Sequence, residues 1–270
     1  MTTLITGAFG CIGVWVIRGL LAAGERPVVF DLGDDPWRVR MIAGPDAPER
    51  LTVVRGDITD RAQLERVVRD HGVRRVIHLA AWQVPLCRQD PPRGAAINVT
   101  GTANEETARI YWEAHRIGSA GFRPLAVYGP GRDFGLTADP TLAMKAAVLG
   151  RRFQARWDGS TDLIYAEDVA RAFLAAAAAR LDGARVYNLH GASASVADVV
   201  RAIEAAWPPA TALITHAGPP LPFPAALDDA RYQKELGPAP PTSLAAGVQK
   251  TLDEFRHLQQ SGRLDARELT

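Results

Sequence analysis

The sequence has few cysteines, almost no net charge and no long apolar run. Its 270 residues include only Cys11 and Cys87, which excludes a disulfide framework and predicts a cytoplasmic location. The net charge of +1 leaves no basic surplus for binding nucleic acid. No apolar run approaches the ~20 residues of a membrane span, and the first residues lack the basic start of a signal peptide. We therefore expect neither nucleic acid nor a membrane as a partner.

Short apolar runs alternate with amphipathic segments in the first half of the chain. Runs typical of buried strands occupy residues 2–7, 27–31, 51–57 and 74–81. Helical spacing of apolar residues marks 14–24 and 59–70, the second with Thr59 or Asp60 as its N-cap. Because these strands are too apolar to have a face in water, the pattern predicts a parallel sheet with helices on both sides.

The second half is richer in loops. Seven prolines between Pro219 and Pro241 mark a loop-rich lobe. Ser195, followed three residues later by Asp198, predicts a capped helix start. Helices are expected at 166–181, 195–207 and 243–258, and strands at 120–131, 184–190 and 211–217.

A glycine-rich turn follows the first predicted strand. In GAFGCIG, Gly7, Gly10 and Gly13 allow a tight turn, close approach of the backbone to a pyrophosphate, and close packing of helix on strand. Asp31 ends the second strand, where a carboxylate accepts ribose hydroxyls and repels a 2′-phosphate. The pattern favours NAD over NADP, although Arg38 and Arg40 leave NADP open. The alternative is a glycine-rich turn with a surface aspartate.

Two further strand ends carry polar or small residues. Asp57, in GDITD, is placed either to hold an adenine amino group or to cap the next helix. HLAA ends the fourth strand, where small alanines let a dinucleotide lie against the backbone. His78 lies within that apolar strand, and a buried histidine with a satisfied ring is favoured over a catalytic one.

Together these segments resemble the extended short-chain dehydrogenase/reductase superfamily, in its NAD-dependent epimerase/dehydratase group. The resemblance implies an α/β fold, a Rossmann-type doubly wound parallel sheet with a small C-terminal substrate lobe. It places an NAD-binding domain at 1–135 and the substrate lobe mainly at 136–270, interleaved with it. The matching segments keep the family's order over nearly the whole chain: GAFGCIG, Asp31, GDITD, VIHLAA, NVTGT, RPLAVYGPGRD, DLIYAEDVARAF and ELGPAPPTSL.

The resemblance also implies which residues contact the cofactor and substrate. The substrate would be a small molecule, a nucleotide-sugar or a similar hydroxylated compound. Arg132, after a Gly-Pro-Gly turn, is the candidate for binding its anion, with a solvated arginine as the alternative. Many relatives contact substrate through an Asn near position 126, where this chain has Ala126. The implied NAD contacts are Gly7, Phe9, Gly10, Cys11, Ile12, Gly13, Asp31, Asp57, Ile58, Leu79, Ala80, Ala81, Asn98 and Pro124. No metal ligands are expected.

The family's catalytic pair is absent from the sequence. Family members pass a hydride to the nicotinamide while a Tyr takes the hydroxyl proton. A Lys four residues on stabilises the phenolate, because a free phenol with a pKa near ~10 is a poor base at neutral pH. The tyrosines are Tyr111, Tyr128, Tyr165, Tyr187 and Tyr232, and four positions after them stand His115, Arg132, Val169, Gly191 and Leu236. No tyrosine therefore has its lysine.

The stretch NVTGTANEETARIYWEAH joins the start of one family helix to the end of another. In the family, a strand and the Tyr-Lys helix start stand between them, so several dozen residues are absent near 102–104. A single helix from Arg93 to Arg116 would overshoot an ordinary strand, or kink at Gly101. Losing the strand would also place the run 74–81 beside the run 120–131.

Three explanations stay open. The sequence omits an internal segment of a normal enzyme, or the deletion is genuine and leaves an NAD-binding protein without chemistry, or Tyr111 and His115 replace the catalytic pair. Continuous numbering favours a genuine deletion, whereas the disrupted sheet favours an omission, and we favour the omission. The expected function is an NAD-dependent epimerase, dehydratase or dehydrogenase; the alternative is a catalytically silent NAD-binding sensor or scaffold. The family resemblance also raises a homodimer as a partner. The helices through which family members dimerise are the two that are joined in this sequence.

Overall fold

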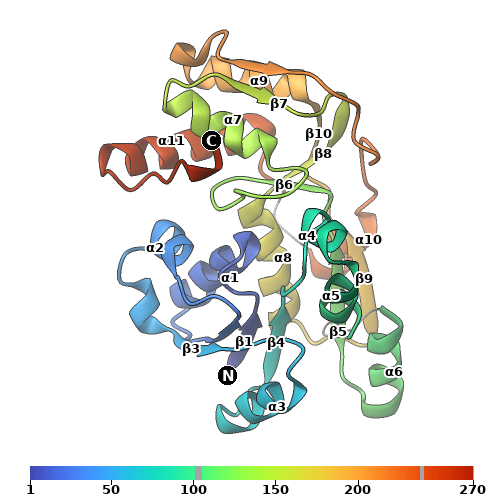
Figure 1. The fold of residues 1–270 in the computed structure, drawn as a ribbon. Coiled ribbons are helices and arrows are strands. Elements are labelled where there is room, and N and C mark those ends of the chain that lie inside the picture. Colours follow the sequence, from blue (N-terminus) through green and yellow to red (C-terminus); the bar gives the residue numbers. More distant parts are fainter. Residues whose placement is uncertain (101–104, 238–239, 270) are drawn as a thin grey trace. The chain divides into compact units, whose positions relative to one another are not determined.

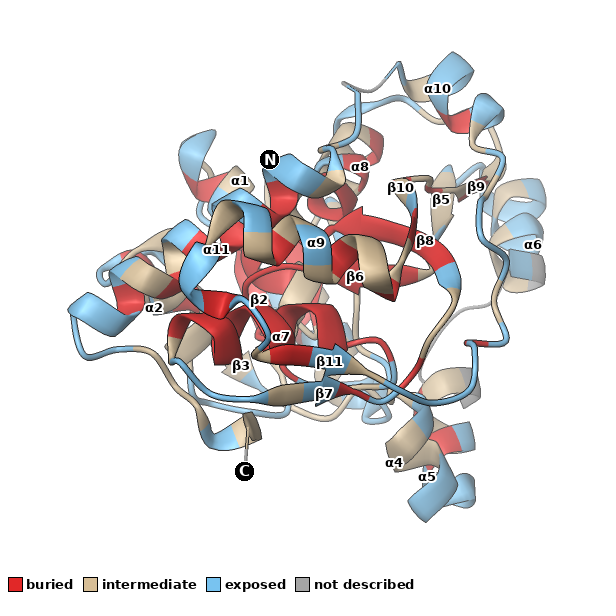
Figure 2. Cartoon of the chain, turned by 90° about the horizontal axis from the view of Figure 1, so that it is seen from above, coloured by how far each residue is buried: buried red, intermediate tan, exposed pale blue. Residues whose placement is uncertain are grey.

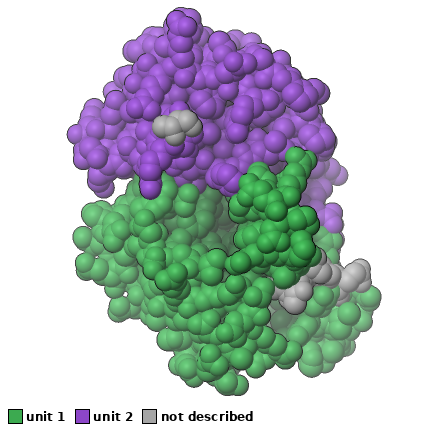
Figure 3. All heavy atoms as spheres, in the orientation of Figure 1, with its two compact units in different colours: residues 1–122, 170–187 green, residues 123–169, 188–270 purple. Residues whose placement is uncertain are grey.

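A computed structural model describes residues 1–100, 105–237 and 240–269. The chain divides into two compact units (Figure 3). The first unit comprises residues 1–122 and 170–187, and the second comprises 123–169 and 188–270. The chain therefore passes from the first unit to the second, returns, and passes to the second again. Each unit is described by itself.

A parallel four-stranded sheet organises the first unit (Figure 1). Its order is β3-β2-β1-β4, and every neighbouring pair is parallel. Parallel pairing brings the carboxyl ends of the strands to one edge, so that Thr6 stands beside both Phe30 and His78. This order and orientation confirm the predicted Rossmann-type α/β class. The elements are β1 (Thr3–Thr6), α1 (Cys11–Ala22), β2 (Val28–Asp31), α2 (Trp37–Ala43), η1 (Ala47–Arg50), β3 (Thr52–Arg55), α3 (Arg61–Asp70) and β4 (Arg75–His78).

Helix α3 covers one face of this sheet. Asp60 caps it by accepting a hydrogen bond from the N–H of Gln63 at 2.9 Å, which settles the predicted choice of cap. Val67 of α3 packs on Leu4 and Phe30 in an apolar cluster. The prediction that all strands are buried on both faces is wrong for the outer strands. Val53 of β3 is 46% exposed and Val76 of β4 is 57% exposed.

The expected single helix over Arg93 to Arg116 is wrong. In the described residues, α5 begins at Pro91, after the cap Asp90, and passes into a π-helical turn that interrupts the α-helix; a helix also covers Glu105–His115. The predicted kink at Gly101 and the join near 102–104 lie outside the described residues. The elements are α4 (Val84–Gln89), α5 (Pro91–Ala95), η2 (Ala96–Thr100) and α6 (Glu105–His115).

The predicted strand over 120–131 is two strands in different sheets. β5 (Ser119–Arg123) pairs with β9 (Ala184–Asn188), whereas β6 (Ala126–Tyr128) belongs to a sheet of the second unit. The expectation that the fourth strand would lie beside this run is also wrong, since β4 ends the four-stranded order. Aromatic packing accounts for the position of β5: its Phe122 contacts Phe173 of α8 (Ala166–Ala178), with ring centroids 4.8 Å apart.

In the second unit, β6 pairs in parallel with β8, and β8 pairs with β10 in the antiparallel sense. Helix α7 (Asp139–Val148) is buried along its whole length (Figure 2), so it is central to the core although its sequence did not reveal it. The predicted cap of Ser195 and Asp198 is confirmed as a reciprocal capping box. The remaining elements are β7 (Phe153–Ala155), β8 (Ser160–Tyr165), β10 (Ala192–Ser195), α9 (Val196–Ala206), η3 (Pro208–Ala210), β11 (Ile214–His216), α10 (Ala230–Leu236), α11 (Leu244–Gln260) and η4 (Arg267–Leu269). Within the described ranges, no helix has the length and apolar character needed to cross a bilayer.

Candidate functional site

The glycine-rich turn links β1 to α1 in a form that side chains would block. Gly7 has a φ of +66°, and a Cβ built on it would lie 2.6 Å from the backbone N of Ala80. A Cβ on Gly13 would lie 2.4 Å from the carbonyl oxygen of Ala8. The first glycine therefore permits the turn and the approach of the β4 end, and the last permits close packing of α1 on the turn.

The N-terminus of α1 points its first-turn amides away from the helix at this turn. Gly10 is the N-cap, with extended backbone, and its N–H donates to the carbonyl of Gly7 at 3.2 Å. The predicted contacts Cys11 and Ile12 are the first two helical residues, and Phe9 is buried in the turn. A helix N-terminus offers amide donors and the positive end of the helix dipole, which suit a diphosphate.

Asp31 is oriented by two backbone amides at the end of β2. Its Oδ2 accepts from the N–H of Phe9 at 2.9 Å, and its Oδ1 accepts from the N–H of Gly33 at 3.0 Å. Each carboxylate oxygen has a second lone pair, so these bonds fix the group and leave it able to accept ribose hydroxyls.

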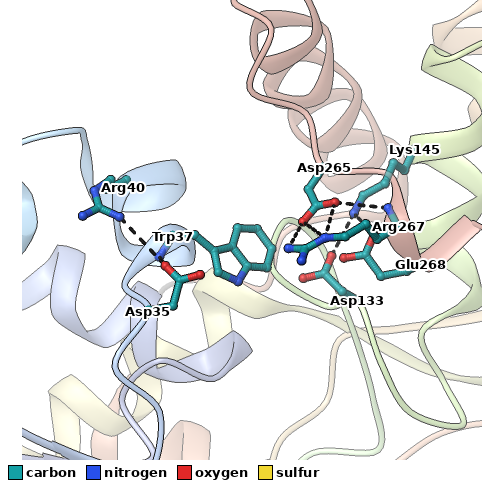
Figure 4. Close-up of polar contacts among 8 residues, drawn as sticks. All are labelled: Asp35, Trp37, Arg40, Asp133, Lys145, Asp265, Arg267 and Glu268. Atoms are coloured by element: carbon teal, nitrogen blue, oxygen red, sulfur yellow. Dashed lines mark hydrogen bonds and ion pairs between the residues drawn. The ribbon is translucent and has the colours of Figure 1, made fainter.

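Arginines of α2 lie close to this carboxylate in sequence. Arg38 stacks over the Trp37 ring at 4.5 Å from the ring centroid and donates to the carbonyl of Phe9 at 3.4 Å. Arg40 pairs at 3.9 Å with Asp35, a contact that Figure 4 shows beside Trp37. Arg38 thus contacts the glycine-rich turn, whereas Arg40 is paired on an exposed surface.

Asp57 and Ile58 occupy the loop after β3. Asp57 Oδ1 accepts from both the N–H and the hydroxyl of Thr59, at 2.9 and 2.7 Å, and these bonds lower the pKa of Asp57. Asp57 is therefore ionised at neutral pH and forms a turn ahead of the cap, Asp60, rather than being the cap itself. Its contact with adenine stays a prediction.

The end of β4 meets the glycine-rich turn. Backbone atoms of Ala80 and Leu79 are the nearest to a Cβ built on Gly7, so the predicted contacts that follow β1 and β4 are brought together. His78 lies 2.5 Å from the Thr6 hydroxyl through Nδ1, and burial lowers the pKa of His78. The predicted hydrogen-bonded histidine is confirmed, but His78 is half-buried and not fully buried.

Asn98 makes contacts that sequence reasoning missed. Its side-chain oxygen accepts from the N–H of Trp82 at 2.7 Å, and its amide donates to the Trp82 carbonyl at 2.9 Å. The same amide lies 3.4 Å from the sulfur of Cys87. Asn98 thus fixes the chain directly after Ala81, and its contact with a cofactor stays a prediction. A lone amide in NVTGT gives no signal of this partner.

The second unit holds Pro124 and Arg132. Pro124 is half-buried between β5 and β6, and Arg132 follows the Gly-Pro-Gly turn after β6. Arg132 Nη2 donates to the Thr137 hydroxyl at 3.0 Å, and the residue as a whole is half-buried. A guanidinium carries five N–H donors in a planar fork, a geometry that suits an oxyanion.

Two tyrosines, Tyr111 and Tyr128, bear on the missing catalytic pair, and replacement of that pair by Tyr111 and His115 stays a prediction. Tyr111 is 51% exposed on α6, and its ring centroid lies 5.7 Å from that of His115. Tyr128 is fully buried, burial raises its pKa, and its hydroxyl has no hydrogen-bond partner among the described residues. A buried phenol with a raised pKa is a worse base than a free one.

A buried carboxylate in the second unit was also missed. Asp162 of β8 is fully buried and accepts from the N–H of Gly191 at 2.9 Å, and it contacts Nδ1 of His190. An acid inside the apolar run STDLIY was the available signal, because buried carboxylates need partners. Among the described residues, no cluster of three or more His, Cys, Asp or Glu side chains could hold a metal ion.

Two family models match overlapping parts of the chain. The model of GDP-mannose 4,6 dehydratase matches residues 4–123, and that of the NAD dependent epimerase/dehydratase family matches residues 102–189. The second match begins where the sequence predicts the join between two family helices.

Known relatives extend these matches. A UDP-glucose 4-epimerase of Mycolicibacterium smegmatis is 26% identical over 96% of this chain and its own full length. A UDP-glucose 4-epimerase of Klebsiella pneumoniae is 31% identical over 38% of this chain and 75% of its own length. The solved UDP-glucose 4-epimerase of Thermotoga maritima, crystallised with UDP-glucose, shares the fold with a TM-score of 0.80 at 19% identity, over 96% of this chain and 100% of that one. The chain therefore belongs to the NAD-dependent epimerase/dehydratase family of Rossmann-fold enzymes.

Proposed function

We propose that the chain is an NAD-dependent oxidoreductase whose glycine-rich turn binds the cofactor and whose second unit binds a nucleotide-sugar. The fit of Gly7 and Gly13 carries the first part, because a methyl group at either position would meet backbone atoms within 3 Å. Family membership gives the cofactor and the enzyme class that the sequence predicted. Bound NAD supplies a hydride acceptor for a hydroxyl-bearing carbon.

Different residues of this chain would bind different parts of the cofactor. The first-turn amides of α1, at Cys11 and Ile12, donate to the diphosphate, and Asp31 accepts the adenosine ribose hydroxyls. The side chain of Asp57 remains ionised through Thr59 and is placed to accept from an adenine amino group. Asp31 also disfavours NADP, since a 2′-phosphate would meet its negative charge.

The substrate part rests on Arg132. Arg132 is half-buried, and the planar fork of N–H donors of a guanidinium suits a diphosphate, which a UDP-sugar carries. The Thermotoga maritima relative was crystallised with UDP-glucose, which makes uridine diphosphate the natural probe.

Proton transfer requires a group that this sequence lacks. The alignment with the Mycolicibacterium smegmatis relative spans 324 positions, and 96% of a 270-residue chain fills about 259 of them, so about 65 positions have no residue here. That number of positions is enough for the strand and the Tyr-Lys helix start. We propose that the complete enzyme has this segment. The second candidate, a silent NAD-binding protein, is favoured by the absence of any Tyr-x-x-x-Lys among the 270 residues.

Mass and turnover together separate the two candidates. The protein isolated from its natural source is expected to exceed 29.1 kDa by about 7 kDa, the mass of about 65 residues. It is also expected to interconvert a UDP-sugar or to form NADH with it. A mass of 29.1 kDa, together with NAD binding and no turnover over a panel of nucleotide-sugars, would contradict the proposed enzyme and support the silent NAD-binding protein.

A further inference from the structure

A buried lysine in the second unit joins the loop after β6 to the C-terminal segment. Lys145 of α7 is 2% exposed, and its ammonium donates to Asp133 Oδ1 and to Glu268 Oε2, each at 3.1 Å. Figure 4 shows these two carboxylates reaching the ammonium from different segments of the chain. A buried ammonium needs such partners, because an unpaired charge in the interior is strongly unfavourable.

The C-terminal segment is itself held in shape beside this lysine. Arg267 donates through Nε to Asp265 Oδ2 at 2.9 Å and through its backbone N–H to Oδ1 at 3.1 Å. Hydrogen bonding to Arg267 lowers the pKa of Asp265, and the charge of Lys145 contributes. The turn of η4 is thereby fixed, and Glu268 is presented to the lysine.

Side chains of helix α7 bind both ends of the loop Gly129–Asp133. The hydroxyl of Thr141 accepts from the N–H of Gly129 at 3.0 Å, and Lys145 binds Asp133. Thr141 and Lys145 are four residues apart, so their side chains leave the helix on one face. Arg132, next to Asp133 in sequence, lies inside the segment that these two contacts restrain.

We propose that Lys145 and Glu268 are positioning residues for Arg132, acting through Asp133. The ammonium fixes the Asp133 carboxylate, and Glu268 is a second acceptor that holds the ammonium in place. The proposal rests on the proposed function only in taking Arg132 as the residue that binds the diphosphate. The restraint on the loop does not depend on that assignment.

Two variants, Lys145→Met and Glu268→Gln, test the proposal with uridine diphosphate and NAD as separate probes. Each is expected to weaken uridine diphosphate binding about tenfold in calorimetry, the effect of roughly one charged hydrogen bond, while NAD binding is unchanged. Amide hydrogen exchange over residues 129–133 is expected to accelerate in both. Glu268→Gln is the milder change, because Glu268 is 21% exposed, and it serves if Lys145→Met does not fold.

The matched control is Arg156→Met. Arg156 pairs through Nε with Asp139 Oδ1 at 3.0 Å, and Asp139 is a fully buried residue of the same helix. This variant is expected to lower the Tm while leaving uridine diphosphate binding and loop exchange unchanged. Wild-type exchange at 129–133 in both test variants would overturn the proposal, as would an equal loss of NAD and uridine diphosphate binding. If the wild type binds no uridine diphosphate but exchange still accelerates, the substrate assignment fails and the restraint stands.

Discussion

The backbone N–H of Phe9 donates to the carboxylate of Asp31 at 2.9 Å, tying the glycine-rich turn to the end of the second strand. The turn after β1 and the end of β2 are thus held together around the place where the cofactor's diphosphate and adenosine ribose are expected. The contact fixes the carboxylate before any ligand binds. Binding therefore loses little conformational entropy at this side chain.

Replacing Asp31 with Asn is expected to weaken NAD binding by roughly tenfold to a hundredfold, since a hydrogen bond to a charged group contributes about 1.5–3 kcal/mol. Binding of NADP is expected to weaken less, because the repulsion of a 2′-phosphate is removed with the charge. Calorimetry with both dinucleotides measures the change in preference. The control is Asp34→Asn, whose carboxylate makes only an exposed pair with Arg55 at 3.1 Å. Equal losses for NAD and NADP would contradict the role given to the charge.

The clash at Gly7 can be separated from its backbone conformation. Gly7 and Gly24 have φ values of +66° and +76°, but a Cβ on Gly24 meets no atom within 4 Å. Gly24→Ala is expected to cost about 1–2 kcal/mol in the free energy of unfolding, the cost of a left-handed alanine. Gly7→Ala is expected to cost about 1–3 kcal/mol more, because the added methyl displaces the backbone at Ala80. Urea unfolding measures both values. A similar loss of unfolding free energy in the two variants would show that the end of β4 shifts at little cost to make room for the methyl group.

The pair of Glu25 and Arg75 predicts a pH-dependent contribution to stability. The guanidinium of Arg75 lowers the pKa of Glu25, helped by a hydrogen bond from the Thr3 hydroxyl at 3.1 Å. A carboxyl with a lowered folded-state pKa stabilises the fold above its unfolded-state pKa and loses this effect as the pH falls through the folded value. Glu25→Gln is therefore expected to be about 1–2 kcal/mol less stable than wild type near neutral pH, with the difference fading in acid.

Urea unfolding of wild type and Glu25→Gln at several pH values measures this difference. Glu65→Gln, which removes an exposed pair with Arg61 on α3, should change stability little at any pH. A difference for Glu25→Gln that persists in strong acid would show that packing, and not charge, underlies it.

The buried hydroxyl of Tyr128 is expected to contribute nothing to stability. It has no hydrogen-bond partner among the described residues, so Tyr128→Phe removes a buried polar group whose desolvation nothing offsets. The free energy of unfolding is expected to stay level or rise by about 1 kcal/mol. Thr251→Val is the contrasting change, because the fully buried Thr251 hydroxyl donates to the Gly247 carbonyl at 2.7 Å and its loss should cost about 1 kcal/mol. A clear loss of stability in Tyr128→Phe would reveal a partner for its hydroxyl.

Local patterns were enough to place most elements of the first unit. Short apolar runs predicted β1 to β4. The helix starts at Asp60 and, in the second unit, at Ser195 followed from side chains that bond to the amide three residues on. The family and the NAD cofactor followed from motifs in the same way. Helix α7 escaped prediction because it is buried on all sides, so that no polar face marks its period.

The sequence by itself determined the turn that suits a diphosphate, the acid beside it and the absence of a Tyr-Lys pair. Only the tertiary structure decided which groups these residues meet. Asn98 holds Trp82, β5 leaves the main sheet for β9, and Lys145 joins Asp133 to Glu268. Such partners stand up to 123 residues apart along the chain. Their pairing depends on which buried charges and unpaired backbone groups the packed chain must satisfy, and no local pattern encodes that.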